Sequence, residues 1–146
     1  MCDSPKTPKV ETVIEDFPGP VVSSYTRKQA LADGALVDVS GEAWKAGFRF
    51  PVAMTRAAWD GCVAWSAEDS ARQTDQDPGG RLWNVLSMAW VNVRTNPKAG
   101  AVLHYQLKRI PRNGTAIEAV TTELKIILSN GDDGKPVLTI LLPHEE

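Results

Sequence analysis

His104 and Glu123 are the first pair of side chains in the sequence that could carry out acid–base chemistry. A two-residue hairpin turn at Asn113-Gly114 would place them opposite each other on neighbouring strands, where the carboxylate can orient the imidazole. Nucleophilic catalysis also needs a serine or cysteine beside the histidine, and no local motif supplies one. We therefore interpret the two residues as a solvent-facing cross-strand pair.

Two glycine-rich segments could bind ions, and neither has a complete motif. Residues 130–134 read Asn-Gly-Asp-Asp-Gly, which lacks the alternating acidic positions and the later glutamate of a calcium-binding loop, so we interpret them as a turn. Gly79-Gly80-Arg81 opens a predicted helix whose N–H groups could face an anion, but Asp77 caps the same helix end and would repel one. The sequence thus predicts no metal site, no cofactor and no catalytic residues, and we expect a protein that is not an enzyme.

The two cysteines differ in their surroundings. Cys62 shares one face of a predicted helix with Trp59 and Val63, so we expect a buried and unreactive thiol. Cys2 lies in the terminal segment and is the thiol that we expect to react. A chain with so few cysteines and no disulfide framework is typical of a reducing compartment, which predicts a cytoplasmic protein.

Tryptophan is concentrated in the middle of the chain. All five tryptophans lie between residues 44 and 90: Trp44, Trp59, Trp65, Trp83 and Trp90. Most are expected to pack helices against a sheet, while Trp65 and Trp83 lie at the edges of their predicted helical stripes. These two flank the polar stretch Ser66–Asp77, which lacks periodicity and is predicted to be a surface loop.

An exposed aromatic pair beside a polar loop has the anatomy of a protein interface, in which aromatic anchors are surrounded by a polar rim. We therefore predict a partner-binding surface formed by Trp65, Trp83, Arg56, Asp69, Arg72 and Asp75. The alternative, that both indole rings cap the core and the loop has no function, stays open at the level of the sequence.

Hydrophobic periodicity and capping residues predict the helices that would position these side chains. Helices are expected over 27–33, 56–65 and 78–94. The last is the longest and carries a wide apolar arc from Leu82 to Val93, so it is predicted to be the core helix. Each helix follows a residue that favours the N-cap position: Thr26, Thr55 and Asp77.

From Ala101 onward the apolar spacing changes from a helical period to alternation. A two-residue turn at Asn113-Gly114 sets three pairs opposite each other: Leu103 and Leu124, Tyr105 and Thr122, and Leu107 and Val120. A third strand is predicted over Val137–Leu142. The expected fold class is α+β, with short helices and one long core helix followed by a C-terminal three-stranded antiparallel meander.

Proline marks two segments as poor candidates for central strands. Residues 1–22 contain four prolines and are predicted to form an extended or disordered arm, which leaves 23–146 as a single domain. Pro51 interrupts the otherwise extended stretch 48–52 and argues against a central strand there.

The composition is that of one ordinary globular domain. The chain has 146 residues, of which 42% are hydrophobic and 23% charged, and its formal net charge is -2. No apolar run reaches the roughly 18 residues that a membrane span needs, and the N-terminal segment lacks the basic start and apolar core of a signal peptide. Basic residues are not gathered in one half, tail or run, which argues against a nucleic-acid partner.

Four parts of the sequence form a recognisable set: SSYTRKQA at 23–30 with LVDVS at 36–40, AGFRFPVAMT at 46–55, GRLW at 80–83 with MA at 88–89, and GDDGKP at 131–136. Together they resemble an uncharacterised family of small proteins encoded by bacterial phages, plasmids and integrative elements. The resemblance supplies no catalytic residues. It implies a context in which accessory proteins act on host proteins, including CRISPR and restriction systems.

The residues and the resemblance together predict a non-enzymatic protein–protein interaction module of a mobile genetic element, whose partner is a host protein or complex. An inhibitor of a host defence complex, of the anti-CRISPR or antirestriction type, is the form that the resemblance implies. The alternative is a nucleic-acid-associated accessory protein in replication, transfer or transcription, with a basic patch of Arg27, Lys28, Arg49 and Arg56. A small hydrolase is a third possibility for which no signature is present, and no membrane partner is expected.

Overall fold

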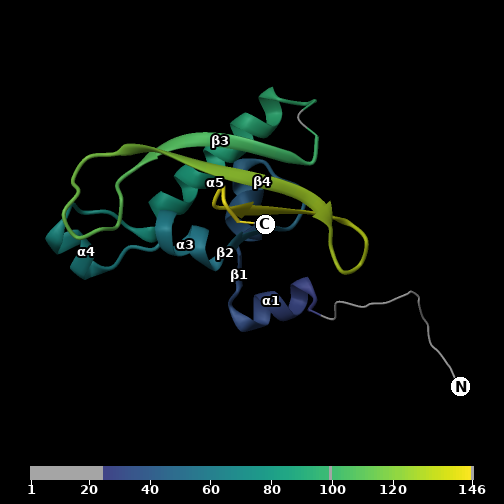
Figure 1. Cartoon of the computed structure of the whole chain (residues 1–146), viewed down its shortest axis with the longest axis horizontal. Coiled ribbons are helices and arrows are strands. Elements are labelled where there is room, and N and C mark those ends of the chain that lie inside the picture. The colour runs from purple at the N-terminus through teal and green to yellow at the C-terminus, as the bar shows by residue number, and fades with distance from the viewer. Residues whose placement is uncertain (1–24, 99, 146) are drawn as a thin grey trace, which may run out of the picture. The chain divides into compact units, whose positions relative to one another are not determined.

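The computed structural model of the chain describes residues 25–98 and 100–145. Its helices are α1 (Arg27–Asp33), α2 (Ser40–Ala46), α3 (Arg56–Cys62), α4 (Ala67–Arg72) and α5 (Pro78–Thr95). Its strands are β1 (Leu36–Asp38), β2 (Val52–Thr55), β3 (Val102–Arg109), β4 (Val120–Asn130) and β5 (Pro136–Leu141) (Figure 1). The predicted arm over 1–22 lies outside the described residues. Residues up to 30 and residues from 31 onward form separate units, and the sheet and its helices belong to the second.

The described strands join one mixed sheet in the order β1-β2-β5-β4-β3. β2 pairs parallel with β5, and the other neighbouring strands pair antiparallel. The α+β class is therefore confirmed. The prediction of a three-stranded antiparallel sheet is wrong, because β3, β4 and β5 form only one side of a five-stranded sheet that continues through β2 to β1.

β2 is an internal strand next to the proline that argued against one. Pro51 precedes the strand instead of interrupting it, and its carbonyl accepts a hydrogen bond from Leu138 N (2.9 Å). Val52, Ala53 and Met54 are all buried, so the strand is covered on both faces. A strand of this kind shows a continuous apolar run rather than alternation, which is why the sequence pattern did not reveal it.

The connection between β3 and β4 differs from the predicted tight turn. β3 ends at Arg109 and β4 begins at Val120, so the two strands are joined by the loop 110–119. Gly114 has a φ of +86°, the left-handed conformation that the predicted turn required, but it lies within this longer loop.

The pairing of β3 with β4 is displaced by two residues from the predicted register. Leu103 pairs with Ile126, and Tyr105 pairs with Leu124. A displacement of two residues keeps every side chain on its own face of the sheet, because side chains alternate with a period of two. Tyr105 and Leu107 are therefore buried as expected, although each pairs with a different residue of β4 from the one predicted.

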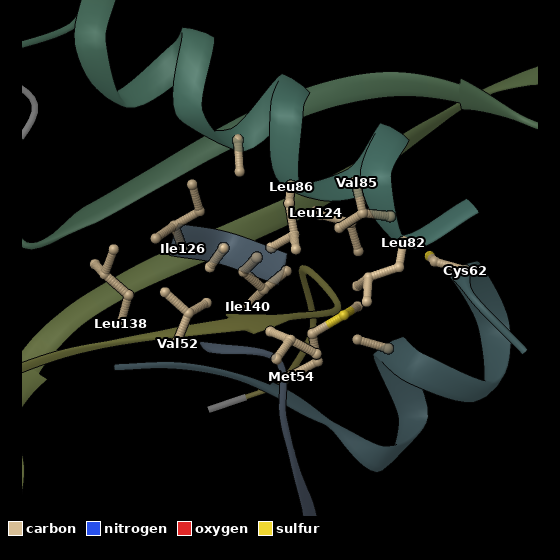
Figure 2. Close-up of a cluster of buried hydrophobic side chains, with 14 of the residues drawn as sticks. Val52, Met54, Cys62, Leu82, Val85, Leu86, Leu124, Ile126, Leu138 and Ile140 are labelled. Atoms are coloured by element: carbon tan, nitrogen blue, oxygen red, sulfur yellow. The ribbon is translucent and has the colours of Figure 1, made fainter. Parts of the chain in front are cut away.

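Helices α2, α3 and α5 pack against one face of the sheet around a buried apolar cluster. Figure 2 shows Leu82, Val85 and Leu86 of α5 beside Met54 and Leu124 of the sheet. These are the residues that make the helix amphipathic, and their burial provides the main driving force for docking it on the strands.

α5 begins as predicted, with Asp77 Oδ1 accepting a hydrogen bond from Gly80 N (2.6 Å) and proline at its first position. Its buried side differs from the predicted arc. Trp90 and Val93 are only partly buried, whereas Arg81 is buried on the same side as Val85. The core helix therefore contributes a charged residue to the interior at its N-terminal end.

Capping residues also define α1 and α3 as predicted. Gln29 N donates to Thr26 Oγ1 (3.0 Å), and Thr26 N donates to Gln29 Oε1 (2.9 Å), which is a reciprocal capping box. At the start of α3, Thr55 Oγ1 accepts a hydrogen bond from Ala58 N (3.2 Å). α3 ends at Cys62 rather than at residue 65, because Ala64 N donates to the Trp59 carbonyl (2.9 Å), which Val63 N already uses, and not to the next carbonyl of the helix. The Val63 carbonyl beyond this end accepts a hydrogen bond from Arg81 Nε (3.1 Å).

The stretch Ser66–Asp77 is not the structureless loop that was predicted, because it contains α4. Ser66 Oγ accepts a hydrogen bond from Asp69 N (3.1 Å), and Asp69 Oδ2 accepts one from Ser66 N (2.8 Å). A six-residue helix is too short to show periodicity, but the Ser-x-x-Asp spacing of this capping box was visible in the sequence.

Candidate binding cavity

The two tryptophans of the predicted partner surface lie in different environments. Trp65 is 6% exposed, and its indole Nε1 donates to Ser70 Oγ (3.0 Å). Trp83 is 45% exposed on α5. Only Trp83 is therefore available as a surface anchor, while Trp65 belongs to the interior beside α4.

Asp69, predicted at the rim, is an interior residue of the structure around α4. Its carboxylate Oδ2 lies 2.6 Å from Arg112 Nε, in addition to the capping bonds with Ser66. The backbone hydrogen bond from Ser66, helped by Arg112, outweighs burial and lowers the pKa of Asp69. The residue thus stays ionised and fastens the loop 110–119 to α4.

The other predicted charged residues are exposed and dispersed. Arg72 lies at the end of α4, 3.9 Å from Glu68, and Asp75 lies in the segment before α5. Arg56 is on α3, where its Nε donates to the Gly34 carbonyl (2.9 Å). The structure therefore brings Trp65 and Asp69 together around α4, and it does not join them with Arg56 into one surface.

Gln73, directly after α4, holds the loop 110–119 in place. Its Nε2 donates to the carbonyls of Pro111 (2.8 Å) and Ala116 (2.5 Å), and its Oε1 accepts from Gly114 N (3.0 Å). In Figure 1 the loop extends from the ends of β3 and β4 toward α4. The loop satisfies its backbone groups on this side chain rather than across a tight hairpin, which explains the displaced register.

Arg81 is a charged residue in the interior, with 6% of its surface exposed. Its Nε donates to the Val63 carbonyl (3.1 Å), and its Nη1 donates to Gln76 Oε1 (2.7 Å) and to the Ile110 carbonyl (3.0 Å). The guanidinium carbon lies 4.5 Å from the centroid of the Trp65 ring. These contacts fix the group in position and leave Nη2 buried with no hydrogen-bond partner among the described residues.

Arg109, at the end of β3, is the second arginine of this region. Its Nε and Nη1 are also buried and have no hydrogen-bond partner within the part of the chain that the structure describes. Burial, together with the charge of Arg109, lowers the pKa of Arg81 to about 10. Burial raises the pKa of the nearby Cys62 thiol, while the charges of Arg109 and Arg81 and a side-chain hydrogen bond with Arg109 act in the opposite direction.

These groups line a cavity of about 410 Å³ between α5, β3 and the two ends of the loop 110–119. Its cationic lining residues are Arg81, Lys108 and Arg109. Cys62 and Val85 contribute to its apolar side, and both lie at one edge of the buried cluster in Figure 2. The cavity therefore combines two arginine side chains with an apolar wall, and N–H donors of both arginines, unpartnered among the described residues, are buried beside it.

His104 and Glu123 lie on the exposed side of the sheet. His104 Nδ1 is 2.7 Å from Glu123 Oε2, and both side chains are about half exposed. The contact is diagonal, because His104 pairs directly with Lys125. The interpretation as a solvent-facing cross-strand pair agrees with this geometry, although the predicted register does not.

The sequence prediction missed the two arginines that distinguish the cavity, although the pattern contained a signal for each. Arg81 lies four residues before Val85 on the apolar stripe of α5, and Arg109 continues the inward alternation of Tyr105 and Leu107. A charged residue at an inward position is expensive unless it is paired, so such positions are candidates for functional sites.

The fold and the cavity define an α+β protein with a five-stranded mixed sheet and an arginine-lined cavity beside its longest described helix. Residues 17–146 match the family of unknown function DUF6573, and the chain belongs to that family. No curated protein and no solved structure matches the chain. Within the described residues, no helix has the length and apolar content to cross a membrane.

Proposed function

We propose that this chain is a non-enzymatic module that binds a partner protein at the mouth of the arginine-lined cavity. The observation that carries the proposal is the exposed indole of Trp83, which is not itself a lining residue but is the chain neighbour of one in α5. Gly80 and Asn84 line the cavity and are exposed, and Trp83 lies next to Asn84 and one turn after Gly80. Tryptophan and arginine are both enriched among the residues that dominate binding energy at protein interfaces.

Partner capture by matched tryptophan variants tests the proposal. Trp83→Ala is compared with Trp44→Ala, because Trp44 on α2 is also exposed (59%) and has no chain neighbour among the residues that line the cavity. The tagged full-length proteins are incubated with host lysate, captured proteins are identified by mass spectrometry, and the unfolding temperature of each variant is measured. Specific loss of one captured protein in Trp83→Ala, at an unchanged unfolding temperature, supports the proposal. Equal capture by both variants contradicts it.

The resemblance to proteins of mobile elements gives the proposal a narrower form, in which the partner is a host protein or complex in the cytoplasm. An inhibitor of a CRISPR or restriction complex is the specific case. The test is expression of the chain in a host with an active defence system, followed by measurement of phage plating or plasmid transformation. We expect wild-type protein to raise the efficiency and Trp83→Ala to leave it low.

A nucleic-acid-associated role is the second candidate, and one observation favours it. The guanidinium carbon of Arg49 lies 4.0 Å from the centroid of the exposed Trp44 ring. An aromatic face beside a cation is the combination that stacks on and neutralises single-stranded nucleic acid. In this case Trp44→Ala, and not Trp83→Ala, weakens DNA binding, and the affinity falls steeply with salt.

A further inference from the structure

We infer that the cavity around Arg81 and Arg109 is a binding site for an oxyanion, namely a carboxylate or phosphate group. This inference deepens the proposed function by naming the chemical group that a partner would present. It rests on the proposed function only in taking a partner protein as the source of that group.

Unpartnered donors are the first observation behind the site. Arg81 Nη2, Arg109 Nε and Arg109 Nη1 are buried and find no acceptor among the residues that the structure describes. Buried polar groups are nearly always hydrogen-bonded, because an unsatisfied buried donor loses its interaction with water and gains nothing in return. An oxyanion supplies several acceptor lone pairs, enough for donors from both guanidinium groups.

Charge is the second observation. Arg81 and Arg109 both line the cavity from inward positions of their elements, and among its described lining residues only Asp77 is acidic. Asp77 Oδ1 accepts the capping hydrogen bond from Gly80 N (2.6 Å) and keeps its negative charge, so the two guanidinium groups exceed this carboxylate by one positive charge. Water could satisfy the free N–H groups, but it would leave the mutual repulsion of the two guanidinium groups in place, whereas an anion removes it.

The third observation is that Arg81 is held rigidly before any ligand arrives. Its Nε and Nη1 donate hydrogen bonds to Val63, Gln76 and Ile110, and its guanidinium carbon lies over the Trp65 ring. Only Nη2 is left for a ligand, so little conformational entropy is lost when an anion binds. The volume of about 410 Å³ lies in the range of small-molecule sites and exceeds what one water molecule fills.

The test follows the arginine side chains by NMR. The full-length ¹⁵N-labelled protein is titrated at constant ionic strength with inorganic phosphate, with acetate and with a blocked acidic peptide, while the Nε–Hε signals of Arg81 and Arg109 are recorded. Arg109→Gln is compared with Arg94→Gln, which removes the same charge from the exposed C-terminal turn of α5 outside the cavity.

We expect saturable shifts of both signals in the wild type and in Arg94→Gln, and binding at least about tenfold weaker in Arg109→Gln. Tighter binding of the peptide that is lost in Trp83→Ala identifies an acidic group of a partner as the source. Equal or tighter binding of phosphate or acetate identifies a free ion. Shifts that stay linear with concentration, or that are unchanged in Arg109→Gln, overturn the inference.

Two further outcomes keep the test decisive. Where Arg109→Gln fails to fold, the wild-type titration decides, because an oxyanion in the cavity must shift the Arg109 Nε–Hε signal itself. Anion binding without partner capture supports the oxyanion site and refutes the proposed function. Trp83-dependent capture without anion binding supports the proposed function and refutes the oxyanion site.

Discussion

Arg81 shows how a single residue changes the surroundings predicted for its neighbours. An arginine in the interior needs acceptors for its N–H groups and a flat surface for its face. Val63, Gln76 and Ile110 supply the acceptors, and Trp65 supplies the surface. Trp65 was predicted at an interface because it lies at the edge of a helical stripe, and it is buried because it covers this guanidinium.

Cys62 is expected to react slowly with thiol reagents in the native protein. Its side chain is 1% exposed, and burial raises its pKa, so both access and thiolate formation are reduced. Labelling with iodoacetamide at mild alkaline pH, read by mass spectrometry, should modify Cys2 first and Cys62 only on unfolding. Modification of Cys62 at the rate of a free thiol in the native protein would contradict this expectation.

Tyr105 makes the protein less stable at high pH. Its hydroxyl donates to the Val85 carbonyl (3.1 Å), and burial raises its pKa. The unfolded chain loses this proton at a pH of about 10, whereas the folded protein keeps it. The folded state then binds more protons than the unfolded state, so the free energy of unfolding falls as the pH rises above that value.

Tyr105→Phe tests this dependence. The variant should lose about 1 kcal/mol at neutral pH, through the missing hydrogen bond, and should show a shallower decline at high pH. Urea unfolding at neutral and alkaline pH measures both effects. The lowered pKa of Arg81 acts with the opposite sign in both proteins, so it cancels in the comparison. An equally steep decline in Tyr105→Phe would show that another group is responsible.

For helices and strands, the sequence predicts features that neighbouring residues determine, such as helix starts. It does not predict features that depend on contacts between distant segments. The starts of α1, α3 and α5 were predicted because each capping side chain lies within three residues of the backbone amide from which it accepts a hydrogen bond. The register of β3 and β4 was wrong because Asn113-Gly114 is only part of a loop that Gln73 fixes from a different element. No property of the hairpin sequence by itself contains that contact.

Gln73→Ala should release the loop 110–119 while leaving the sheet intact. The variant removes three hydrogen bonds to the loop, so we expect a loss of about 1–3 kcal/mol and faster hydrogen exchange at the Gly114 amide, which donates to Gln73 Oε1. Gln106→Ala, at an exposed position of β3, is the matched control and should change neither quantity. Unchanged exchange at Gly114 in Gln73→Ala would mean that other contacts hold the loop.

At the scale of the whole molecule, the parallel pairing of β2 with β5 joins the first strands of the sheet to its C-terminal strands. Fully buried strands show continuous apolar runs, and partners far apart in sequence are not specified by any local pattern. The α+β class could be predicted because helical apolar periods precede alternating ones along the chain. The order of the five strands in the sheet could not be predicted in this way. The cavity depends on the same long-range arrangement, because it forms only when Arg81 of α5 meets Arg109 of β3.

Met54→Ala tests whether β2 is part of the core. Met54 is fully buried and pairs with Ile140, so the variant should lose about 2–5 kcal/mol of unfolding free energy. Val102→Ala is the control, since Val102 is exposed and should lose no more than about 0.5 kcal/mol. Both values follow from urea unfolding curves. Similar losses in the two variants would contradict an internal position for β2.

A crystal structure of the full-length protein grown with phosphate tests the inference that Arg81 and Arg109 together hold an oxyanion. We expect a tetrahedral anion within hydrogen-bond distance of both Arg81 Nη2 and Arg109, and we expect it to be absent from isomorphous crystals of Arg109→Gln. Water alone in the cavity at saturating phosphate, or an ion pair between these arginines and the Asp77 carboxylate, would contradict the inference.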